Sequence, residues 1–181
     1  MASTPVRLAG VRVGLRDFRS ADAHAVHRWF NTPQVIEGLV EQRESFSEEE
    51  ARRWVERAAQ QDGPDRKWAV DVDERPEPAG FTALYGVGRQ AAPELGILIG
   101  DSDLWGRGVG TEAQRLTIAH AFNELGAHRV IELILARNSA ARHVVERLGF
   151  ELEGMMRGHV KRGERLLDVA VYGLSPEGFK G

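Results

Sequence analysis

Three glycines at alternate positions form the most distinctive chemical feature of this sequence. They belong to the stretch Leu104-Trp105-Gly106-Arg107-Gly108-Val109-Gly110-Thr111-Glu112-Ala113. An apolar, alternating run precedes them at 94–99, and a helical pattern follows over about 109–125. Glycine lets a ligand approach the backbone closely, and the first turn of a helix offers unpaired N–H groups at the positive end of its dipole. The stretch therefore predicts a phosphate-binding turn, to which Arg107 can add a charge-assisted contact.

Two other phosphate-binding patterns fit this stretch poorly. A P-loop ends in Gly-Lys-Ser/Thr, whereas this chain reads Gly110-Thr111-Glu112. The dinucleotide fingerprint needs a third glycine, and that position is Thr111 when counted from Gly106, or Ala113 when counted from Gly108. The second count is allowed, but that fingerprint opens a parallel sheet, and several predicted strands precede this loop. A plain strand-to-helix turn without a ligand stays open as the structural alternative.

Two ordered blocks of the chain resemble the GNAT acetyltransferases. The stretch 104–113 looks like their coenzyme A pyrophosphate loop, and it is most similar to the RimJ/RimL-type N-acetyltransferases, whose loop runs Trp-Gly-Lys/Arg-Gly-x-Gly/Ala-Thr-Glu-Ala. The second block resembles that family's asparagine-initiated helix and Leu-Gly-Phe exit, and it reads Asn138-Ser139-Ala140-Ala141-Arg142, then Glu146-Arg147-Leu148-Gly149-Phe150-Glu151 and Glu153-Gly154. The resemblance covers nearly the whole chain and is weaker before about Lys67. It implies transfer of an acetyl group from acetyl-CoA to an amine.

The resemblance also implies where acetyl-CoA binds. Backbone N–H groups of the glycine loop hold the diphosphate, and the strand before the loop splays from the next parallel strand and pairs with the pantetheine arm. A free N–H on that strand can stabilise the oxyanion of the tetrahedral intermediate. Asn138 matches the family asparagine near the pantetheine, with a plain helix N-cap as the alternative. The expected cofactor contacts are Leu98, Ile99, Gly100, Trp105, Gly106, Arg107, Gly108, Val109, Gly110, Thr111 and Asn138.

The expected catalytic residues are Glu94 and Ser139. The amine must lose a proton before it attacks, and an α-amine with a pKa of about 8 loses it more readily than a lysine with a pKa of about 10.4. Glu94 matches a glutamate common in the family, either as the base, directly or through a water, or as a group that only positions the substrate cation. Many family members carry a tyrosine acid where this chain has Val145. Ser139 resembles the serine of RimL-like members, although CoA can also leave without a protein acid.

For the acceptor site, the sequence indicates a segment of the chain and few individual residues. Trp29 and Phe30 end a predicted helix that Ser20 can cap, and they either pack in the core or wall the acceptor pocket. The irregular segment 31–46 links the first two helices, a link that helps to shape the acceptor site in the resembled family. Its acidic residues suit a polyamine, but its arginine and a peptide acceptor fit equally well. These charged residues are Glu37, Glu41, Glu44 and Arg43.

The remaining candidates are histidines and hairpin residues. His24 and His27 share one face of a predicted helix, but no third ligand is near, so we expect no metal. His159, Tyr172 and Asp168 lie on a predicted terminal hairpin, which often borders the acceptor site in the resembled family. Ordinary packing or surface placement is the alternative for each of them.

Hydrophobic periodicity predicts one α/β domain spanning 1–181. We expect a mixed sheet of about seven strands, flanked by about four helices. An antiparallel meander comes first, then a parallel βαβ unit at the acetyl-CoA site, then the terminal hairpin. The expected strands are 11–18, 67–72, 79–87, 94–100, 129–136, 151–160 and 165–174, and the expected helices are 20–30, 47–61, 109–125 and 138–148. The second helix should begin with a capping box at Ser47-Glu48-Glu49-Glu50. The third helix should bury Ala113, Leu116, Ala119 and Phe122.

Composition excludes several classes of protein. The chain has 181 residues, a formal net charge of −3 and no cysteine, which removes disulfides, thiolate metal sites and a cysteine nucleophile. Residues 1–5 lack a basic-then-apolar signal pattern, and no apolar run approaches the ~20 residues that span a bilayer. We expect a cytoplasmic protein that binds acetyl-CoA and an amine, but neither nucleic acid nor membrane, and we leave a homodimer open.

Three functions remain open at this point. The first is an N-acetyltransferase for a protein or peptide N-terminus, as in the RimJ/RimL type. The second acetylates a small amine, such as a polyamine, an aminoglycoside or another antibiotic. The third is a module that binds acyl-CoA without catalysis, which the missing tyrosine favours and which Glu94 and the intact loop oppose.

Overall fold

A single mixed sheet of eight strands forms the centre of the molecule. The computed structural model describes residues 7–41, 45–61, 63–73, 75–89 and 92–181, and its strand order is β1-β2-β3-β4-β5-β6-β8-β7. Neighbouring strands are antiparallel, apart from the parallel pair β5 and β6. The strands are β1 Arg7–Ala9, β2 Val13–Arg16, β3 Arg66–Val72, β4 Gly80–Tyr85, β5 Glu94–Ile99, β6 Val130–Leu135, β7 Glu151–Arg162 and β8 Arg165–Leu174. The predicted meander, βαβ unit and hairpin are confirmed, and β1 is an additional edge strand.

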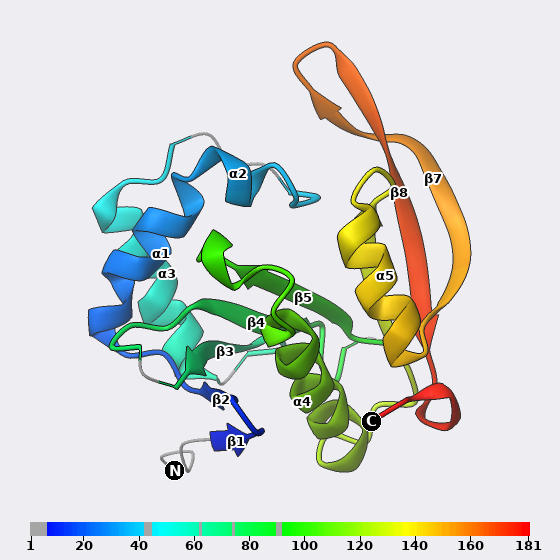
Figure 1. Ribbon diagram of the computed structural model, residues 1–181, viewed down its shortest axis with the longest axis horizontal. Helices are drawn as coiled ribbons and strands as arrows, with labels where there is room; N and C mark the ends of the chain where they lie inside the picture. The colour runs from blue at the N-terminus through cyan, green and yellow to red at the C-terminus, as the bar shows by residue number, and fades with distance from the viewer. Residues whose placement is uncertain (1–6, 42–44, 62, 74, 90–91) are drawn as a thin grey trace.

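Helices cover both faces of this sheet (Figure 1). They are α1 Ala23–Phe30, α2 Pro33–Ile36, α3 Glu48–Gln60, α4 Val109–Asn123 and α5 Ser139–Leu148. The four predicted helices are present, and the single-turn α2 is additional. The capping box of α3 is confirmed, because Ser47 Oγ accepts from the Glu50 N–H at 3.2 Å and the Glu50 carboxylate accepts from the Ser47 N–H at 2.8 Å.

The predicted cap of α1 was wrong. Ser20 lies inside a 3₁₀ turn, Ser20–Asp22, that precedes the helix. The buried carboxylate of Asp22 accepts from the Arg19 N–H at 2.8 Å and also binds Arg16, with Oδ2 2.7 Å from Arg16 Nη1. Asp22 therefore holds the turn that starts this helix, and the Ser20 side chain stays exposed.

Two hydrophobic clusters lie on opposite faces of the sheet. One joins the sheet to α4 and α5 and includes Leu15, Trp68, Ile118 and Leu148. The other joins the sheet to α1 and α3 and includes Phe18, Trp29, Trp54, Phe81 and Leu98. Adjacent residues of β3, Trp68 and Ala69, belong to different clusters, as the alternation of a strand requires.

The buried face of α4 differs from the predicted face by about one residue. Its buried residues are Val109, Ala113, Gln114, Thr117, Ile118 and Ala121, whereas Leu116, Ala119 and Phe122 are only partly buried. Periodicity failed here because small and polar residues face the core. The buried Thr117 hydroxyl donates to Ala113 O at 2.9 Å and lies 3.0 Å from Thr82 Oγ1, so it is fully satisfied in the core.

Candidate active site

The glycine loop has the backbone conformation that its sequence predicts. Gly106 and Gly108 have φ angles of +73° and +84°, a region that residues with a Cβ rarely adopt. A Cβ on either residue would meet no atom within 4 Å, so conformation and not crowding requires glycine here. Gly108 is the N-cap of the 15-residue helix α4, and the loop therefore leads directly into the first turn of that helix.

The loop leaves five backbone N–H groups without an acceptor among the described residues. The Arg107 N–H donates to Leu104 O at 3.2 Å, and the Glu112 N–H donates to Gly108 O at 2.9 Å. The amides between and beside these two are unpaired in the described part of the chain, and they belong to Gly106, Gly108, Val109, Gly110 and Thr111. Five donors at the positive end of a helix dipole fit a diphosphate, and the exposed Arg107 can add a charge-assisted contact.

Two side chains of the loop motif anchor it to neighbouring elements. The Trp105 indole N–H donates to Ile99 O, the last carbonyl of β5, at 2.8 Å, and 47 % of Trp105 is exposed. The Glu112 carboxylate accepts from the Val11 N–H and from the Arg12 N–H at 3.0 Å, which ties the β1–β2 turn to α4. The structural role of Glu112 was not predicted, because its partners are about 100 residues away in the chain.

β5 and β6 diverge as the resemblance implies. Each strand has six residues, but they pair at one register position, Glu94 with Ile131. The backbone groups of β5 alternate between its two neighbours. Since the Gly100 N–H donates to Ala79 O at 2.8 Å, the amides of Leu98 and Gly100 face β4, and those of Ile97 and Ile99 face the side where β6 diverges.

This register changes the predicted backbone contacts. Leu98 and Gly100 were expected to offer amides to the pantetheine arm, but their amides face β4. In the described part of the chain, the β5 amides that have no strand partner belong instead to Ile97, which the sequence did not single out, and to Ile99, which it did. Successive amides of a strand point to alternate sides, so the direction of one amide fixes the directions of all the others. No residue pattern in the sequence gives that first direction.

Trp29 and Phe30 lie in the core. Trp29 is fully buried and Phe30 is 8 % exposed, and both belong to the cluster beneath α1 and α3. Trp29 packs directly against Gly100, and Phe30 contacts Phe46 with ring centroids 4.9 Å apart. Of the two interpretations, core packing is the one that this burial supports, since neither side chain presents a wall to a pocket.

Glu94 is half-buried at the point where β5 and β6 meet. It shares a sheet face with Leu98, which is the face covered by α1 and α3. Burial, and next the negative charge of Glu41, raise the pKa of the Glu94 carboxyl. A carboxyl with a raised pKa is a stronger base once it has lost its proton, which suits a group that removes a proton from an ammonium.

A second carboxyl, Glu132, was missed by sequence reasoning. It lies in the apolar strand β6 next to Ile131, it is 4 % exposed, and its Oε2 has no hydrogen-bond partner among the described residues. Burial, and next the charge of Glu94, raise the pKa of Glu132 to about 8. Its neighbours Val130 and Ile134 belong to the cluster beneath α4 and α5, so Glu132 and Glu94 lie on opposite faces of the sheet. A single charge inside the run Val130–Leu135 was the signal for it.

Asn138 caps α5, as one of its two interpretations predicts. Its Oδ1 accepts from the Ala141 N–H at 3.1 Å, while its Nδ2 would lie 3.4 Å from a Cβ on Gly38. Gly38 follows α2, so Asn138 is in contact with the segment expected to shape the acceptor site. Ser139 is the exposed first residue of α5, and Val145 is fully buried.

The other hairpin and histidine candidates have structural partners or exposed positions. The Tyr172 hydroxyl is packed in the core, donates to Glu146 Oε1 at 2.7 Å and accepts from Arg142 Nε at 2.9 Å. Asp168 accepts from the Gly158 N–H at 2.7 Å, beside an irregularity in the hairpin register. His24 lies 3.1 Å from Glu77, and His159 is exposed. Within the described residues, no cluster of three or more His, Cys, Asp or Glu could hold a metal.

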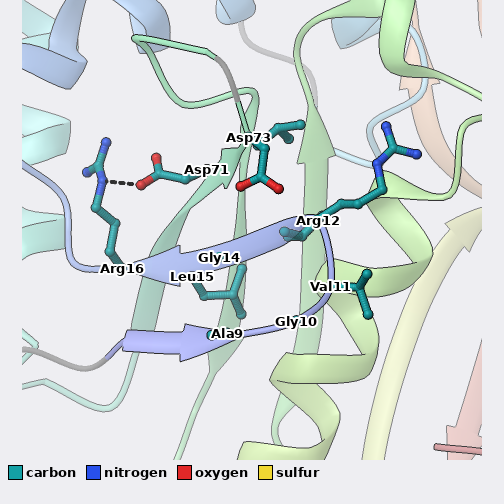
Figure 2. A pocket seen from close by; sticks show the side chains of 11 residues that line it. Ala9, Gly10, Val11, Arg12, Gly14, Leu15, Arg16, Asp71 and Asp73 are labelled. Atoms are coloured by element: carbon teal, nitrogen blue, oxygen red, sulfur yellow. Dashed lines mark hydrogen bonds and ion pairs between the residues drawn. The ribbon is translucent and has the colours of Figure 1, made fainter.

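A cavity of about 400 Å³ lies between α2 and the β7–β8 hairpin. We call it the arginine pocket, because its lining includes Arg137, Arg162 and Arg165, together with Ile36, Glu37 and Leu167. A smaller cavity of about 190 Å³ lies at the opposite edge of the sheet, beside β1 and β2 (Figure 2). There Arg16 is paired with Asp71, with Arg16 Nε 2.8 Å from Asp71 Oδ2, and the lining also includes one more residue of each sign, Arg12 and Asp73.

Comparison with known proteins places this chain in a family. The model of the acetyltransferase (GNAT) domain matches residues 12–151. The N-acetyltransferase YoaA of Bacillus subtilis (strain 168) is 26 % identical over 168 residues, which cover 90 % of this chain and 93 % of YoaA. The probable N-acetyltransferase YjcK of the same strain is 43 % identical over 56 residues, but this match spans only 31 % of either protein.

Solved structures share the fold. The RimL ribosomal L7/L12 α-N-protein acetyltransferase in complex with coenzyme A has a TM-score of 0.82 at 19 % identity, and the match covers 94 % of this chain and 98 % of that one. Mycobacterium smegmatis RimJ in complex with CoA-disulfide has a TM-score of 0.81 at 20 % identity, with 98 % and 88 % covered.

The fold and its loop thus define an enzyme class, the acetyltransferases that use acetyl-CoA. The chain belongs to the GNAT N-acetyltransferase family, since the family model matches more than half of it. The predicted family and enzyme class are confirmed. Within the described residues, no helix is both long and apolar enough to cross a membrane.

Proposed function

We propose that this protein transfers the acetyl group of acetyl-CoA to the α-amine of a protein or peptide N-terminus, by direct attack within a ternary complex. The observation that carries the proposal is the position of Glu94, a half-buried carboxyl with a raised pKa where β5 meets β6. An α-amine needs only a moderate base, because its pKa is about 8. The RimL structure among the fold neighbours is described as a protein α-N-acetyltransferase, which supports this choice of acceptor.

In the proposed arrangement, the free amides from Gly106 to Thr111 bind the diphosphate, with Arg107 and Trp105 beside them. The pantetheine arm lies along the Ile97 and Ile99 edge of β5 and passes Asn138. One of the two β5 amides donates to the thioester oxygen, where negative charge develops during attack. These cofactor roles are proposals that rest on the backbone directions described above.

The proposed reaction removes two protons from the amine nitrogen and exchanges one bond at the acetyl carbon. The Glu94 carboxylate takes the proton of the ammonium, directly or through a water, and the amine nitrogen then attacks the thioester carbon. The carbon–sulfur bond breaks and the CoA thiolate leaves. The nitrogen gives up its second proton, either to solvent when the thiolate leaves unaided, or to the thiolate through the hydroxyl of Ser139, which is exposed at the start of α5. Several expectations stay predictions. They are a cytoplasmic location, the absence of a metal, of a nucleic-acid partner and of a membrane partner, and the possibility of a homodimer.

The second candidate is acetylation of a small amine. Glu41 is close enough to Glu94 for its charge to raise the Glu94 pKa, and two carboxylates would attract a polyamine. The arginine pocket on the same segment opposes a purely cationic acceptor. The third candidate is a module that binds acyl-CoA without catalysis. The half-buried Glu94 carboxyl with its raised pKa opposes it, because such a module needs no base.

The deciding experiment is thiol release from acetyl-CoA with a panel of amines. The panel holds peptides with free and with blocked N-termini, polyamines, aminoglycosides and single amino acids, and the protein adds no thiol background because it has no cysteine. We expect release with free peptides that stops when the N-terminus is blocked. Release with small amines alone would replace this proposal with the second candidate. Silence across the panel, with acetyl-CoA binding measured in the same preparation, would favour the third.

A further inference from the structure

The arginine pocket carries a positive charge that the described residues do not balance. Its described lining has three arginines, Arg137, Arg162 and Arg165, and a single acidic residue, Glu37. Glu37 Oε1 lies 3.2 Å from Arg137 Nη1, which leaves two arginines without a carboxylate partner among the described residues. The pocket lies between two separate elements, α2 and the hairpin, and it is partly open to solvent.

Among the described residues, backbone groups alone bind the side chain of Arg162. Its guanidinium donates to Glu37 O at 2.6 Å and to Leu39 O, and its Nε is buried without a partner among the described residues. Burial, and next the charge of Arg137, lower the pKa of Arg162, and the charge of Glu37 opposes them only in part. The geometry therefore leaves this cluster short of an anion, while the contact between Glu37 and Arg137 shows that a carboxylate fits it.

The pocket is connected to the reacting centre by the short segment that follows α2. Glu37 lines the pocket, Gly38 contacts the Asn138 amide, and the charge of Glu41 acts on Glu94. Four residue steps separate Glu37 from Glu41, which is at most about 14 Å of extended chain. A positive region and a negative region thus lie a few residues apart along one side of the site.

We infer that the acceptor carries a carboxylate close to its reacting amine, and that the arginine pocket binds that carboxylate while the amine approaches Glu94. This inference rests on the proposed acetyl transfer to a free amine. The complementary ligand has a cation at one end and an anion at the other, as an N-terminus followed within a few residues by Asp or Glu does. Bidentate binding by arginine suits a planar carboxylate. A small amino acid offers the same chemistry at a shorter spacing.

The test compares three peptides of equal length with free N-termini. They carry Glu, Gln or Lys at the second to fourth positions, and free glutamate serves as the small-acid arm. We expect the Glu peptide to have a KM about tenfold below that of the Gln peptide, with similar kcat, and the Lys peptide to be poorest. Equal KM values for the Glu and Gln peptides would overturn the inference while leaving the acetyl transfer itself established. Turnover of free glutamate at a comparable KM would assign the pocket to a small acid.

Matched arginine variants locate the effect. Arg165 is exposed at the start of β8 and Arg137 is exposed after β6, so Arg165→Gln and Arg137→Gln should leave the fold intact. Either substitution should raise the KM for the Glu peptide several-fold and leave the KM for the Gln peptide unchanged. Arg147→Gln, at the other end of α5, removes an exposed charge outside the pocket and should change neither KM. An equal effect of Arg165→Gln on both peptides would count against the pocket.

A binding measurement separates this inference from the proposed function. If no peptide is acetylated, the proposed function fails, and the pocket is then tested by calorimetric titration with the Glu and Gln peptides in the presence of CoA. The carboxylate site is supported if the Glu peptide binds more tightly than the Gln peptide and if Arg165→Gln abolishes this difference. Equal binding of the two peptides, or no change on Arg165→Gln, would remove it.

Discussion

The indole ring of Trp29 occupies the space in which a side chain on Gly100 would lie. A Cβ built on Gly100 would be 1.8 Å from Trp29 Cδ1, and Trp29 is fully buried. Gly100 ends β5 just before the glycine loop, and its N–H donates to Ala79 O at 2.8 Å. This contact fixes the exit of β5 between a buried aromatic ring and the neighbouring strand, so glycine is required at this position by packing.

Gly100→Ala should therefore destabilise the fold. Neither the buried indole nor the bonded backbone can move away cheaply, and overpacking of this kind costs about 1–3 kcal/mol, occasionally more. Urea unfolding should show a lower midpoint with an unchanged slope. Gly110→Ala is the control, because its Cβ would lie 3.6 Å from Ile99 Cγ1, an ordinary contact. Equal midpoints for the two variants would contradict the packing described here.

Glu94 should set the acidic limb of the pH–rate profile. Because burial and Glu41 raise its pKa, the rate should rise with pH through a value above the ordinary glutamate pKa of about 4.3. Glu41→Gln removes one of the two causes and should move this limb to lower pH. Glu94→Gln should lower kcat by roughly 10²–10⁴-fold if the carboxylate is the base. A rise in KM with little change in kcat would instead assign Glu94 to substrate positioning.

Glu132 should make the protein less stable as pH rises. Its pKa is raised to about 8 in the fold, against about 4.3 in the unfolded chain. Between these values the folded state holds the additional proton, so the free energy of unfolding falls with increasing pH. Glu132→Gln removes the ionisation and should raise the free energy of unfolding at pH 8 by roughly 1–3 kcal/mol, with little difference below about pH 4. Glu151→Gln, an exposed carboxylate on β7, is the control.

That pH dependence is the decisive readout for Glu132. A polar group that merely packs well would give the same difference between wild type and Glu132→Gln at every pH. Urea unfolding at a series of pH values separates the two cases. Loss of stability at pH 8 on substitution would mean that the carboxyl makes a stabilising contact in the fold.

The local parts of this fold were predictable from sequence because they depend on local rules. The Ser47 capping box, the Asn138 cap and the hairpin turn are each encoded within a few residues, and the structure confirms them. The glycine loop belongs to the same class, because its backbone turn requires residues that tolerate positive φ at Gly106 and Gly108. Its conformation could be expected before any contact with the rest of the chain was known.

The parts that sequence could not supply depend on register or on distant residues. The amide directions on β5 follow from one hydrogen bond between Gly100 and Ala79. Without it, Leu98 and Gly100 were expected together with Ile99, and Ile97 was not. The arginine pocket brings Glu37 against Arg137 and Arg162, which are 100 and 125 residues away in sequence. Glu132 lies in an apolar run that was interpreted as a buried strand, and its single charge was not singled out as a candidate.

Gly108→Ala should weaken coenzyme A binding more than it weakens the fold. A φ of +84° costs a residue with a Cβ about 1–2 kcal/mol, and relief of that strain would turn the free amides away from the diphosphate. We expect at least a several-fold increase in Kd for CoA by titration. Gly88→Ala is a matched control, because Gly88 has a φ of +73° and open space around it. It should lose similar stability and keep the CoA affinity of wild type.

One conservative substitution separates the two roles of Asn138, which are the cap of α5 and the proposed contact with the pantetheine. Asp caps helices as well as Asn does, so Asn138→Asp keeps the contact to the Ala141 N–H but loses the Nδ2 donor. We expect its free energy of unfolding to stay within about 0.5 kcal/mol of wild type, while the KM for acetyl-CoA rises several-fold. Asn138→Ala should lose both, including about 1 kcal/mol of stability.

The control for this pair is the cap of a different helix. Ser47→Ala removes a side-chain bond of the same kind at the start of α3, so it should cost about 1 kcal/mol and leave the KM for acetyl-CoA unchanged. Wild-type kinetics for Asn138→Asp would show that the asparagine serves α5 alone. The pantetheine would then be bound by the backbone of Ile97 and Ile99 at the edge of β5, without a contribution from Asn138.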